Sequence, residues 1–490
     1  MQTIGYKKFG LIFLVSSLLI TFSCRKDENP ISEKIKKNKV VNEWINGYME
    51  VLYYWNTRLP AKKDLSLSPD VFYESLLYKA EDRFSFIADD FEELMGQLSG
   101  VQMEAGYDFT LFLTEQGSKD LVGVVNYIKP FSAASSTDLK RGDIFYTVNG
   151  KQLTIDNYQK LANEMSAKHT LGVYRDNKIQ SMSLNVTKYE ENPIFLDSIY
   201  VIDGKKIAYL VYNFFAVDKG DYSYKYLKEL NEVFGKYKNN NVDEVILDLR
   251  YNTGGQVIIT PALAGMISNR SSSDLFCTDQ YNSIVDRELK KESGNDYNKT
   301  FFEDFLSITD KNGNIVDKSI PINKLTGLPR LYVLTSQKTA SASELLINGL
   351  KPYMNVILIG DKTLGKNVGM WFIYEQDTKK QKDNRWGLLP IVFKTFNSEN
   401  KSEYGNGFNV DIKADEYGAF PLLPLGDTDE ILLKAALVQI GVKKASGFRS
   451  DEKRFYSQPL MSSIDRTPVR KNMIKHQKQL PEIFKFTENF

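Results

Sequence analysis

Short apolar runs alternate with helical patterns through the middle of the chain, and this alternation limits the possible folds more than any other feature. The strand candidates are residues 207–214, 245–249, 331–334 and 356–359. The helical patterns between them cover 224–234, a stretch ending near 268, and 343–350. Strands that are apolar throughout are typical of a sheet covered on both faces. Residues 191–444 are therefore predicted to form an α/β domain with largely parallel strands.

Two regions of different character precede this domain. Residues 38–98 repeat apolar side chains at steps of three and four, as in Val41, Ile45 and Tyr48, which predicts helices. Residues 99–190 contain short apolar strands broken by polar turns such as Asn149-Gly150, which predicts a compact β module. Within 191–444, the polar stretch at about 271–325 is expected to be an insertion, and the charged residues 445–490 a surface tail.

The N-terminus resembles a bacterial lipoprotein signal. Two lysines precede the apolar run 11–22, which ends at Ser23-Cys24. This pattern predicts a signal peptide over 1–23, lipidation of Cys24, and a polar tether over 24–37. An ordinary signal peptide with an incidental cysteine is the alternative. Lipidation would leave Cys277 as the remaining cysteine, without a partner for an intrachain disulfide.

Charge and histidine content exclude several kinds of function. The 63 basic and 62 acidic residues leave a net charge of +1, so no basic excess is available for a nucleic-acid partner. The only histidines are His169 and His476, both expected at the surface. A histidine-built metal site or a Ser-His-Asp triad is therefore not expected, and no cofactor or metal is predicted. A nucleophilic enzyme with this composition would need another base, for which lysine is the natural candidate.

Three segments follow predicted strands and carry residues suited to that chemistry: Thr339-Ala-Ser-Ala-Ser-Glu344, Gly360-Asp-Lys-Thr-Leu-Gly-Lys366 and Asp248-Leu-Arg-Tyr-Asn-Thr-Gly-Gly255. The first opens a helix, whose leading N–H groups lack intrahelical acceptors and can stabilise an oxyanion. In the second, a desolvated Lys366 would have a lowered pKa and could act as a base. Taken singly, the first is also compatible with an ordinary helix cap and the second with a surface turn.

Together these segments resemble the C-terminal processing, or tail-specific, serine protease family. Lys366 follows Ser341 by 25 residues, the spacing of the family's nucleophile and base. The resemblance implies Ser341 as nucleophile and Lys366 as general base, with the N–H groups of Ala342 and Gly254 as the oxyanion hole. Gly255 and Ser343 would have supporting roles, Ser343 being the alternative nucleophile.

The same resemblance extends over most of the chain and implies a crotonase/ClpP-like catalytic domain. Residues 139–150 look like a PDZ signature, and Asp82-Arg-Phe-Ser85 resembles a segment of the family's N-terminal region. Residues 386–408 look like the segment before the final helix in members of this family from Bacteroidetes, which are of the lipoprotein type. Many members carry a glutamine four residues after the lysine, where this chain has Met370. The carboxylate-binding loop of a PDZ domain is also hard to place near Gly106.

Four functions remain open at this point. The favoured one is a Ser–Lys endopeptidase of the bacterial cell envelope, anchored by Cys24 at the periplasmic face of the outer membrane or at the cell surface. It would cleave or trim polypeptides whose C-termini bind the PDZ-type module. The alternatives are a non-catalytic peptide- or ligand-binding lipoprotein on the same scaffold, a crotonase-like acyl-transfer enzyme, and a surface scaffold.

Overall fold

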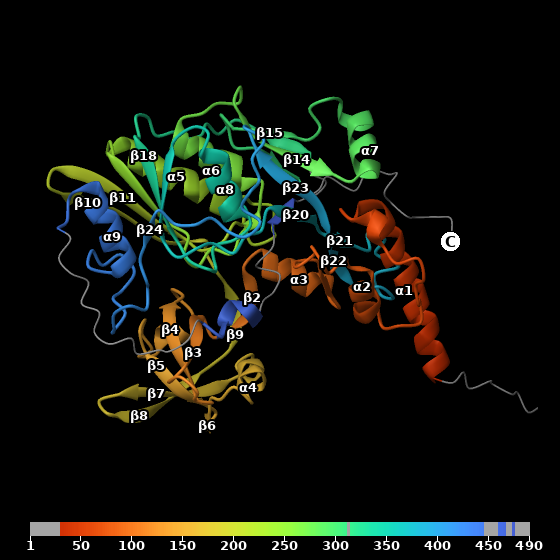
Figure 1. Cartoon of the computed structure of the whole chain (residues 1–490), viewed down its shortest axis with the longest axis horizontal. Helices are drawn as coiled ribbons and strands as arrows, with labels where there is room; N and C mark the ends of the chain where they lie inside the picture. The colour runs from red at the N-terminus through yellow and green to blue at the C-terminus, as the bar shows by residue number, and fades with distance from the viewer. Residues whose placement is uncertain (1–29, 311–313, 445–458, 467–472, 476–490) are drawn as a thin grey trace, which may run out of the picture.

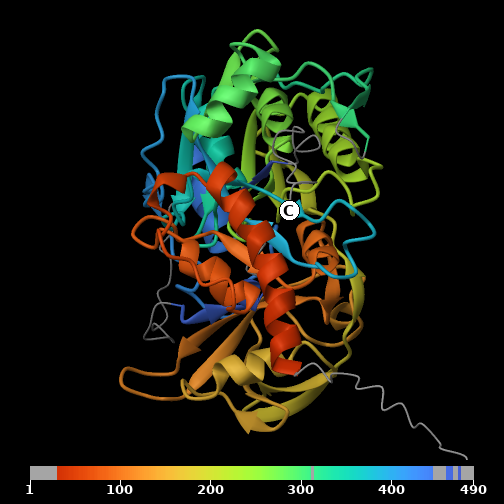
Figure 2. The same ribbon diagram turned by 90° about the vertical axis from the view of Figure 1, so that its right-hand side faces the viewer.

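The computed structural model describes residues 30–310, 314–444, 459–466 and 473–475. Its N-terminal region consists of α1 (Pro30–Leu52), the 3-10 helix η1 (Asn56–Arg58), α2 (Pro69–Leu76), β1 (Phe86–Ala88) and α3 (Phe91–Leu98). The predicted apolar face of α1 is buried, and α2 begins at Ser68-Pro69 as expected. Figure 2 shows α1 in red, running lengthwise over this side of the molecule.

A small antiparallel sheet follows and has a hydrophobic core of its own. Its strands are β3 (Tyr107–Leu113), β4 (Leu121–Ile128), β5 (Ile144–Val148), β6 (Lys151–Gln152), β7 (His169–Arg175) and β8 (Lys178–Leu184). The same small module also contains the 3-10 helix η2 (Ala134–Ser136), after β4, and the helix α4 (Tyr158–Glu164). The pair β2 (Val101–Glu104) and β9 (Thr187–Glu190) frames this module. Figure 1 shows it below the larger α/β body.

The expected surface position of His169 is wrong. Its side chain is buried in the small module because it opens β7 facing the module's interior. Nε2 lies 2.9 Å from the Tyr107 hydroxyl and Nδ1 lies 2.7 Å from the Ala167 carbonyl oxygen. Both ring nitrogens thus have hydrogen-bond partners inside the module, so His169 serves its core. His476 lies outside the described residues.

The main sheet has six strands in the order β10-β11-β12-β18-β19-β24. Their bounds are β10 (Ile194–Ile202), β11 (Lys205–Tyr212), β12 (Glu244–Asp248), β18 (Arg330–Thr335), β19 (Asn355–Gly360) and β24 (Ile412–Lys413). β10 is antiparallel to β11, and the other neighbours are parallel. One face packs on α5 (Lys225–Asn239), α6 (Ile259–Ser268) and α8 (Ala342–Leu350), and the other on α9 (Ile431–Ile440). The mixed α/β fold with an N-terminal region is confirmed.

A second six-stranded sheet has the order β13-β26-β20-β23-β14-β15. Its strands are β13 (Gly255–Gln256), β26 (Met473–Lys475), β20 (Val368–Trp371), β23 (Ile391–Asn397), β14 (Leu275–Tyr281) and β15 (Lys299–Phe301). The smaller elements are α7 (Ser283–Ser293), the pair β16 (Ile308–Thr309) and β17 (Ile315–Asp317), and β21 (Ile373–Tyr374) with β22 (Gly387–Leu389) beside β1.

Residues 271–325 are therefore not a separate polar insertion. β14 lies between β23 and β15 in the second sheet, and Phe276, Val285 and Phe302 are buried in the main core. The strand was not predicted because polar residues, Thr278, Asp279 and Gln280, interrupt the apolar residues of β14.

The residues beyond 444 are also not simply a surface tail. Their described parts form β25 (Met461–Ser462), the 3-10 helix η3 (Ser463–Arg466) and β26, and the two strands join two different sheets. The predicted signal peptide, Cys24 and residues 25–29 of the tether lie outside the described residues. The prediction of a tether is wrong for residues 30–37, because they form the first turns of α1. Over the described ranges, no helix has the length and apolar character needed to cross a bilayer.

Candidate functional site

Ser341 lies in the turn between β18 and the start of α8. Its backbone has φ 63° and ψ −115°, a conformation that costs a non-glycine residue free energy and is typical of a nucleophile held on a sharp strand-to-helix turn. The side chain is fully buried, and its Oγ makes no hydrogen bond to any described residue. The turn therefore holds a buried hydroxyl directly before the leading N–H groups of α8.

Lys366 lies in the loop after β19 and is also fully buried. Its Nζ is 3.7 Å from the Met370 Sδ and 4.9 Å from the centre of the Phe84 ring. Burial lowers the pKa of Lys366 well below its usual value, while the negative charges of Asp82 and Glu344 act in the opposite direction. A neutral amine can take up a proton, as a general base must.

Glu344 joins the loops that carry these two residues. Its Oε2 accepts the backbone N–H groups of Ser341 at 2.9 Å and Lys366 at 2.8 Å. Its Oε1 accepts the Gly365 N–H at 2.8 Å and the Thr363 hydroxyl at 2.6 Å. Because one oxygen binds both backbones, the serine and lysine loops are neighbours in space.

The sequence analysis missed this role of Glu344. The signal was present, because Ser341-Ala-Ser-Glu344 has the Ser-x-x-Glu spacing of a capping box, in which the glutamate accepts the N–H of the capping residue. That spacing accounts for the bond to Ser341. The bonds to the lysine loop depend on the tertiary fold.

The two predicted glycines pack directly against neighbouring backbone. Gly254 has φ 106°, and a Cβ there would lie 2.6 Å from the Cβ of Ser341. Gly255 has φ 130°, and its Cβ would lie 2.2 Å from the Phe215 carbonyl oxygen. Both positions need glycine, for the backbone conformation and for the space. Gly254 thus lies beside the candidate nucleophile, and its role in an oxyanion hole stays a prediction.

The Gly254 N–H, however, donates to the Asn252 side-chain oxygen at 2.9 Å. An oxyanion role for Gly254 therefore requires this bond to be exchanged. Ser343 Oγ donates to the Asn252 carbonyl oxygen at 3.2 Å and is buried in the first turn of α8. Ala342 is the first residue of α8 and follows Ser341, where helix geometry leaves N–H groups without intrahelical acceptors.

The N-terminal region also reaches the site. The Asp82 carboxylate accepts the Tyr53 hydroxyl at 2.8 Å and the N–H groups of Phe84 and Ser85. Arg83 donates to the Gly365 carbonyl oxygen at 2.8 Å, in the loop that carries the lysine. These bonds hold the Phe84 ring over the lysine amine. The Asp82–Ser85 segment resembles one of the family, but its contact with the site was not predicted from the sequence.

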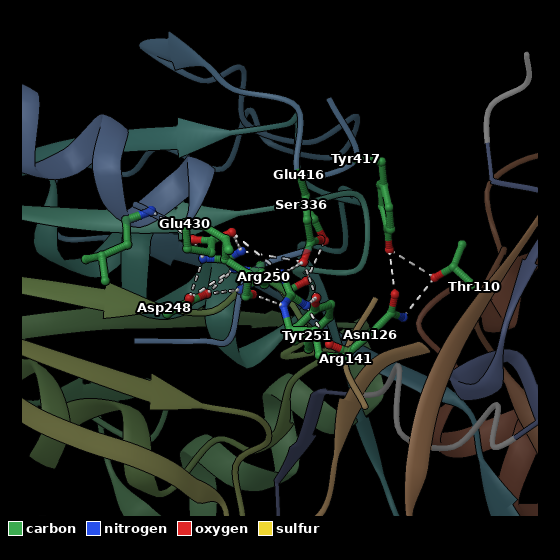
Figure 3. A network of polar contacts seen from close by, with 12 residues as sticks. Thr110, Asn126, Arg141, Asp248, Arg250, Tyr251, Ser336, Glu416, Tyr417 and Glu430 are labelled. Atoms are coloured by element: carbon green, nitrogen blue, oxygen red, sulfur yellow. Dashed lines mark hydrogen bonds and ion pairs between the residues drawn. The ribbon is translucent and has the colours of Figure 1, made fainter. Parts of the chain in front are cut away.

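A buried ionic network anchors the third motif (Figure 3). Arg250 is fully buried and donates to the carboxylates of Asp248 and Glu430, the latter at 2.6 and 3.0 Å. Arg141, from the small module, donates to Glu416 at 2.8 Å and to the Tyr251 hydroxyl at 2.6 Å. The network fixes the segment that ends at the two glycines and ties it to the small module.

Over the described ranges, no group of three or more His, Cys, Asp and Glu side chains is arranged to hold a metal ion. The groups gathered at the site are the buried hydroxyl of Ser341, the buried amine of Lys366, the Glu344 carboxylate that binds both loops, and backbone N–H groups beside glycines. Such a set can perform nucleophilic substitution at a carbonyl group.

Comparisons with known proteins agree with this chemistry. The profile of peptidase family S41 matches residues 206–413, and that of the peptidase S41 N-terminal domain matches residues 40–86. A sequence search of the curated proteins gives no match.

The chain is also similar to solved structures. The chain is similar to a Bacteroides fragilis protein described as an S41 protease, with 25% identity, a TM-score of 0.62, and coverage of 82% of this chain and 98% of the other. It also overlaps a photosystem II D1 C-terminal processing protease at 17% identity and a TM-score of 0.43, covering 81% and 98%. The chain matches both domains of the family in sequence order and is similar to the first of these structures. It therefore belongs to peptidase family S41 and is a serine peptidase.

Proposed function

We propose that the chain is an endopeptidase that cleaves extended polypeptides with Ser341 as nucleophile and Lys366 as general base. One observation carries this assignment: Ser341 and Lys366 donate their backbone N–H groups to the same oxygen of Glu344, while the lysine amine is buried against Phe84 and Met370. The hydroxyl and the desolvated amine thus belong to adjoining loops.

The reaction would proceed in two stages. The neutral amine of Lys366 takes the proton of Ser341 Oγ as the oxygen attacks the peptide carbonyl carbon, and the resulting ammonium gives this proton to the departing amine. Water then attacks the acyl carbon as the amine takes one of its protons; the bond from that carbon to Ser341 Oγ breaks, the ammonium returns the proton to Oγ, and the new C-terminal carboxyl group is released. The Ala342 N–H would stabilise the oxyanion, joined by that of Gly254 once it leaves Asn252.

Ser341 Oγ has no hydrogen-bond partner among the described residues, so the hydroxyl and the amine are not bonded to each other in this state. Rotation about the side-chain bonds of Ser341 and Lys366 is the movement that would join them. Bound substrate would favour that movement, because the acyl group must lie against Ser341 and the first N–H groups of α8.

We also propose that the small module is a PDZ-type domain that binds the C-terminal part of a substrate. Its separate core and the strand added along β3 support this role, since PDZ domains bind peptides as an extra strand at a sheet edge. Secretion, lipidation at Cys24, location at the cell envelope and the absence of a nucleic-acid partner are proposed from the sequence alone.

The decisive experiment labels the protein with a serine-directed fluorophosphonate and identifies the modified residue. We expect Ser341 to be labelled, and Ser341→Ala to abolish labelling and casein cleavage with a nearly unchanged melting temperature. Ser343→Ala is the matched control and should retain both. Labelling of Ser343, or undiminished cleavage by Ser341→Ala, would refute the assignment. No labelling and no cleavage by the wild type would favour the non-catalytic binding protein.

A further inference from the structure

Two short pieces of the C-terminal segment 459–475 are built into two different sheets. β25 pairs with β3 in antiparallel fashion, with Met461 opposite Leu111 and Ser462 opposite Thr110. β26 lies between β13 and β20 in the second sheet. Figure 1 shows both pieces in dark blue, one at the small module and the other near β20. The first described piece thus lies at the small module and the second lies in the neighbourhood of the site.

At the small module, the segment covers the edge of β3. The Leu460 N–H donates to the Leu111 carbonyl oxygen at 2.9 Å, and the Phe109 N–H donates to Ser463 Oγ at 3.2 Å. Ser463 Oγ also bonds the Asp108 carboxylate. Without β25, β3 would be the edge strand of its sheet, with main-chain groups open to another strand. The contact is β-augmentation, the mode by which peptides bind sheet edges.

This edge is connected to the nucleophile loop. Lys338, three residues before Ser341, lies 3.3 Å from the same Asp108 carboxylate. A cavity of about 650 Å³ lies here, lined by residues of β3, by the loop 335–338 and by residues 459–462 of the segment. The segment therefore forms one wall of the space between the small module and the loop that leads to the nucleophile.

At the second sheet, β26 fills a slot one strand wide beside the site. Met473 pairs with Gly255, the residue after Gly254. Ile474 pairs with Met370, the residue whose sulfur contacts the lysine amine. β13 and β20 each pair with β26 and not with each other, so without it they would be about two strand spacings, roughly 10 Å, apart.

We propose that residues 459–466 and 473–475 act together as an intramolecular inhibitor that occupies the β3 edge and the slot between β13 and β20 in place of a substrate. This inference depends on the proposed function, because the two occupied places are the module edge and the approach to Ser341 and Lys366. It also describes the substrate, an extended polypeptide that adds as a strand at both places.

The inhibition would be reversible and competitive. A tethered segment acts at an effective concentration on the order of 1 mM, and the apparent affinity for substrate falls in proportion to the fraction of molecules with an open site. Micromolar peptide substrates would therefore meet a mostly occupied site. Release of the segment should lower KM and leave kcat nearly unchanged.

The test uses the full chain with Leu460→Pro and Ile474→Pro together. Proline removes the N–H that Leu460 donates to β3 and disrupts the strand at Ile474. The matched control carries Leu460→Ala and Ile474→Ala, which keep both N–H groups. We expect kcat/KM for an unstructured fluorogenic peptide to rise about tenfold or more in the proline variant only. Equal kcat/KM in the two variants would overturn the proposal.

A binding assay separates failure of this inference from failure of the proposed function. Both variants also receive Ser341→Ala, and a fluorescent peptide of residues 455–480 is titrated by anisotropy. Binding at least tenfold tighter to the proline variant supports the inference even if no variant cleaves any peptide. Equal binding to the two variants, or to neither, contradicts it. Loss of the C-terminal segment from the wild type, but not from Ser341→Ala, would also overturn it, because the segment would then be a substrate.

Discussion

Replacing Glu344 by glutamine tests whether one buried carboxylate organises the site. The two carboxylate oxygens accept four hydrogen bonds, two at each oxygen. In Glu344→Gln the side-chain NH₂ group replaces one oxygen and faces two donors, so two bonds to a charged acceptor are lost. Such bonds contribute about 1.5–3 kcal/mol each, which gives a loss of about 3–6 kcal/mol in the free energy of unfolding.

This loss is large beside the total stability of a typical protein, about 5–15 kcal/mol. Urea unfolding measures it, with Glu399→Gln as the matched control. Glu399 forms an exposed ion pair with Lys401, so its variant should change the unfolding free energy by about 0.5 kcal/mol or less. Because the serine and lysine loops would shift relative to each other, we also expect kcat to fall about 100-fold.

The pH dependence separates this role from a merely structural one. The charge of Glu344 raises the pKa of Lys366, so its removal lowers that pKa further. The rising limb of the pH–kcat profile should therefore move to lower pH in Glu344→Gln. Wild-type stability and kcat in this variant, or a limb that moves to higher pH, would refute the reasoning.

Three further predictions follow from the buried charges and from the lysine's neighbour. Burial lowers the pKa of Lys366, so between that lowered value and about 10.4 the lysine binds a proton in the unfolded state but not in the folded state. The free energy of unfolding should therefore rise with pH over this range. Melting scans of Lys366→Met at several pH values should lack this rise. Met370→Gln should raise kcat about 2- to 10-fold by giving the lysine amine a stronger acceptor, whereas a gain of the same size in Met370→Leu would show that packing is responsible. Glu430→Gln should lower the free energy of unfolding by about 3 kcal/mol, because Arg250 stays buried with a weakened partner. Denaturant unfolding measures this loss, and the exposed control Asp429→Asn should differ little from wild type.

Much of the main sheet could be predicted because its strands are buried on both faces. A run such as Val245–Leu247 is apolar throughout and needs no tertiary information to be identified. β14 was not predicted because Thr278, Asp279 and Gln280 interrupt its apolar residues in a polar part of the chain. β25 and β26 escaped because each is only two or three residues long, and their pairing depends on sheets that distant parts of the chain build.

The candidate site could be predicted in part for a related reason. Its three motifs follow parallel strands, whose carboxyl ends lie at one edge of a sheet, so Ser341, Lys366 and Gly254 were expected together. The bond between the Gly254 N–H and Asn252 could not be anticipated, because it depends on the local conformation of that loop.

The contact between Phe84 and Lys366 means that the base depends on a part of the chain far away in sequence. Burial lowers the pKa of the lysine amine, and the Phe84 ring is part of what covers the amine; this ring is held by Asp82 and by the Arg83 bond to the lysine loop. If the segment 82–85 moved away, water would reach the amine, its pKa would rise toward the ordinary value, and at neutral pH it would become an ammonium ion that cannot accept a proton. The N-terminal region is thus part of the acid–base chemistry as well as of the core, and a perturbation that loosens it should reduce activity before it unfolds the sheet.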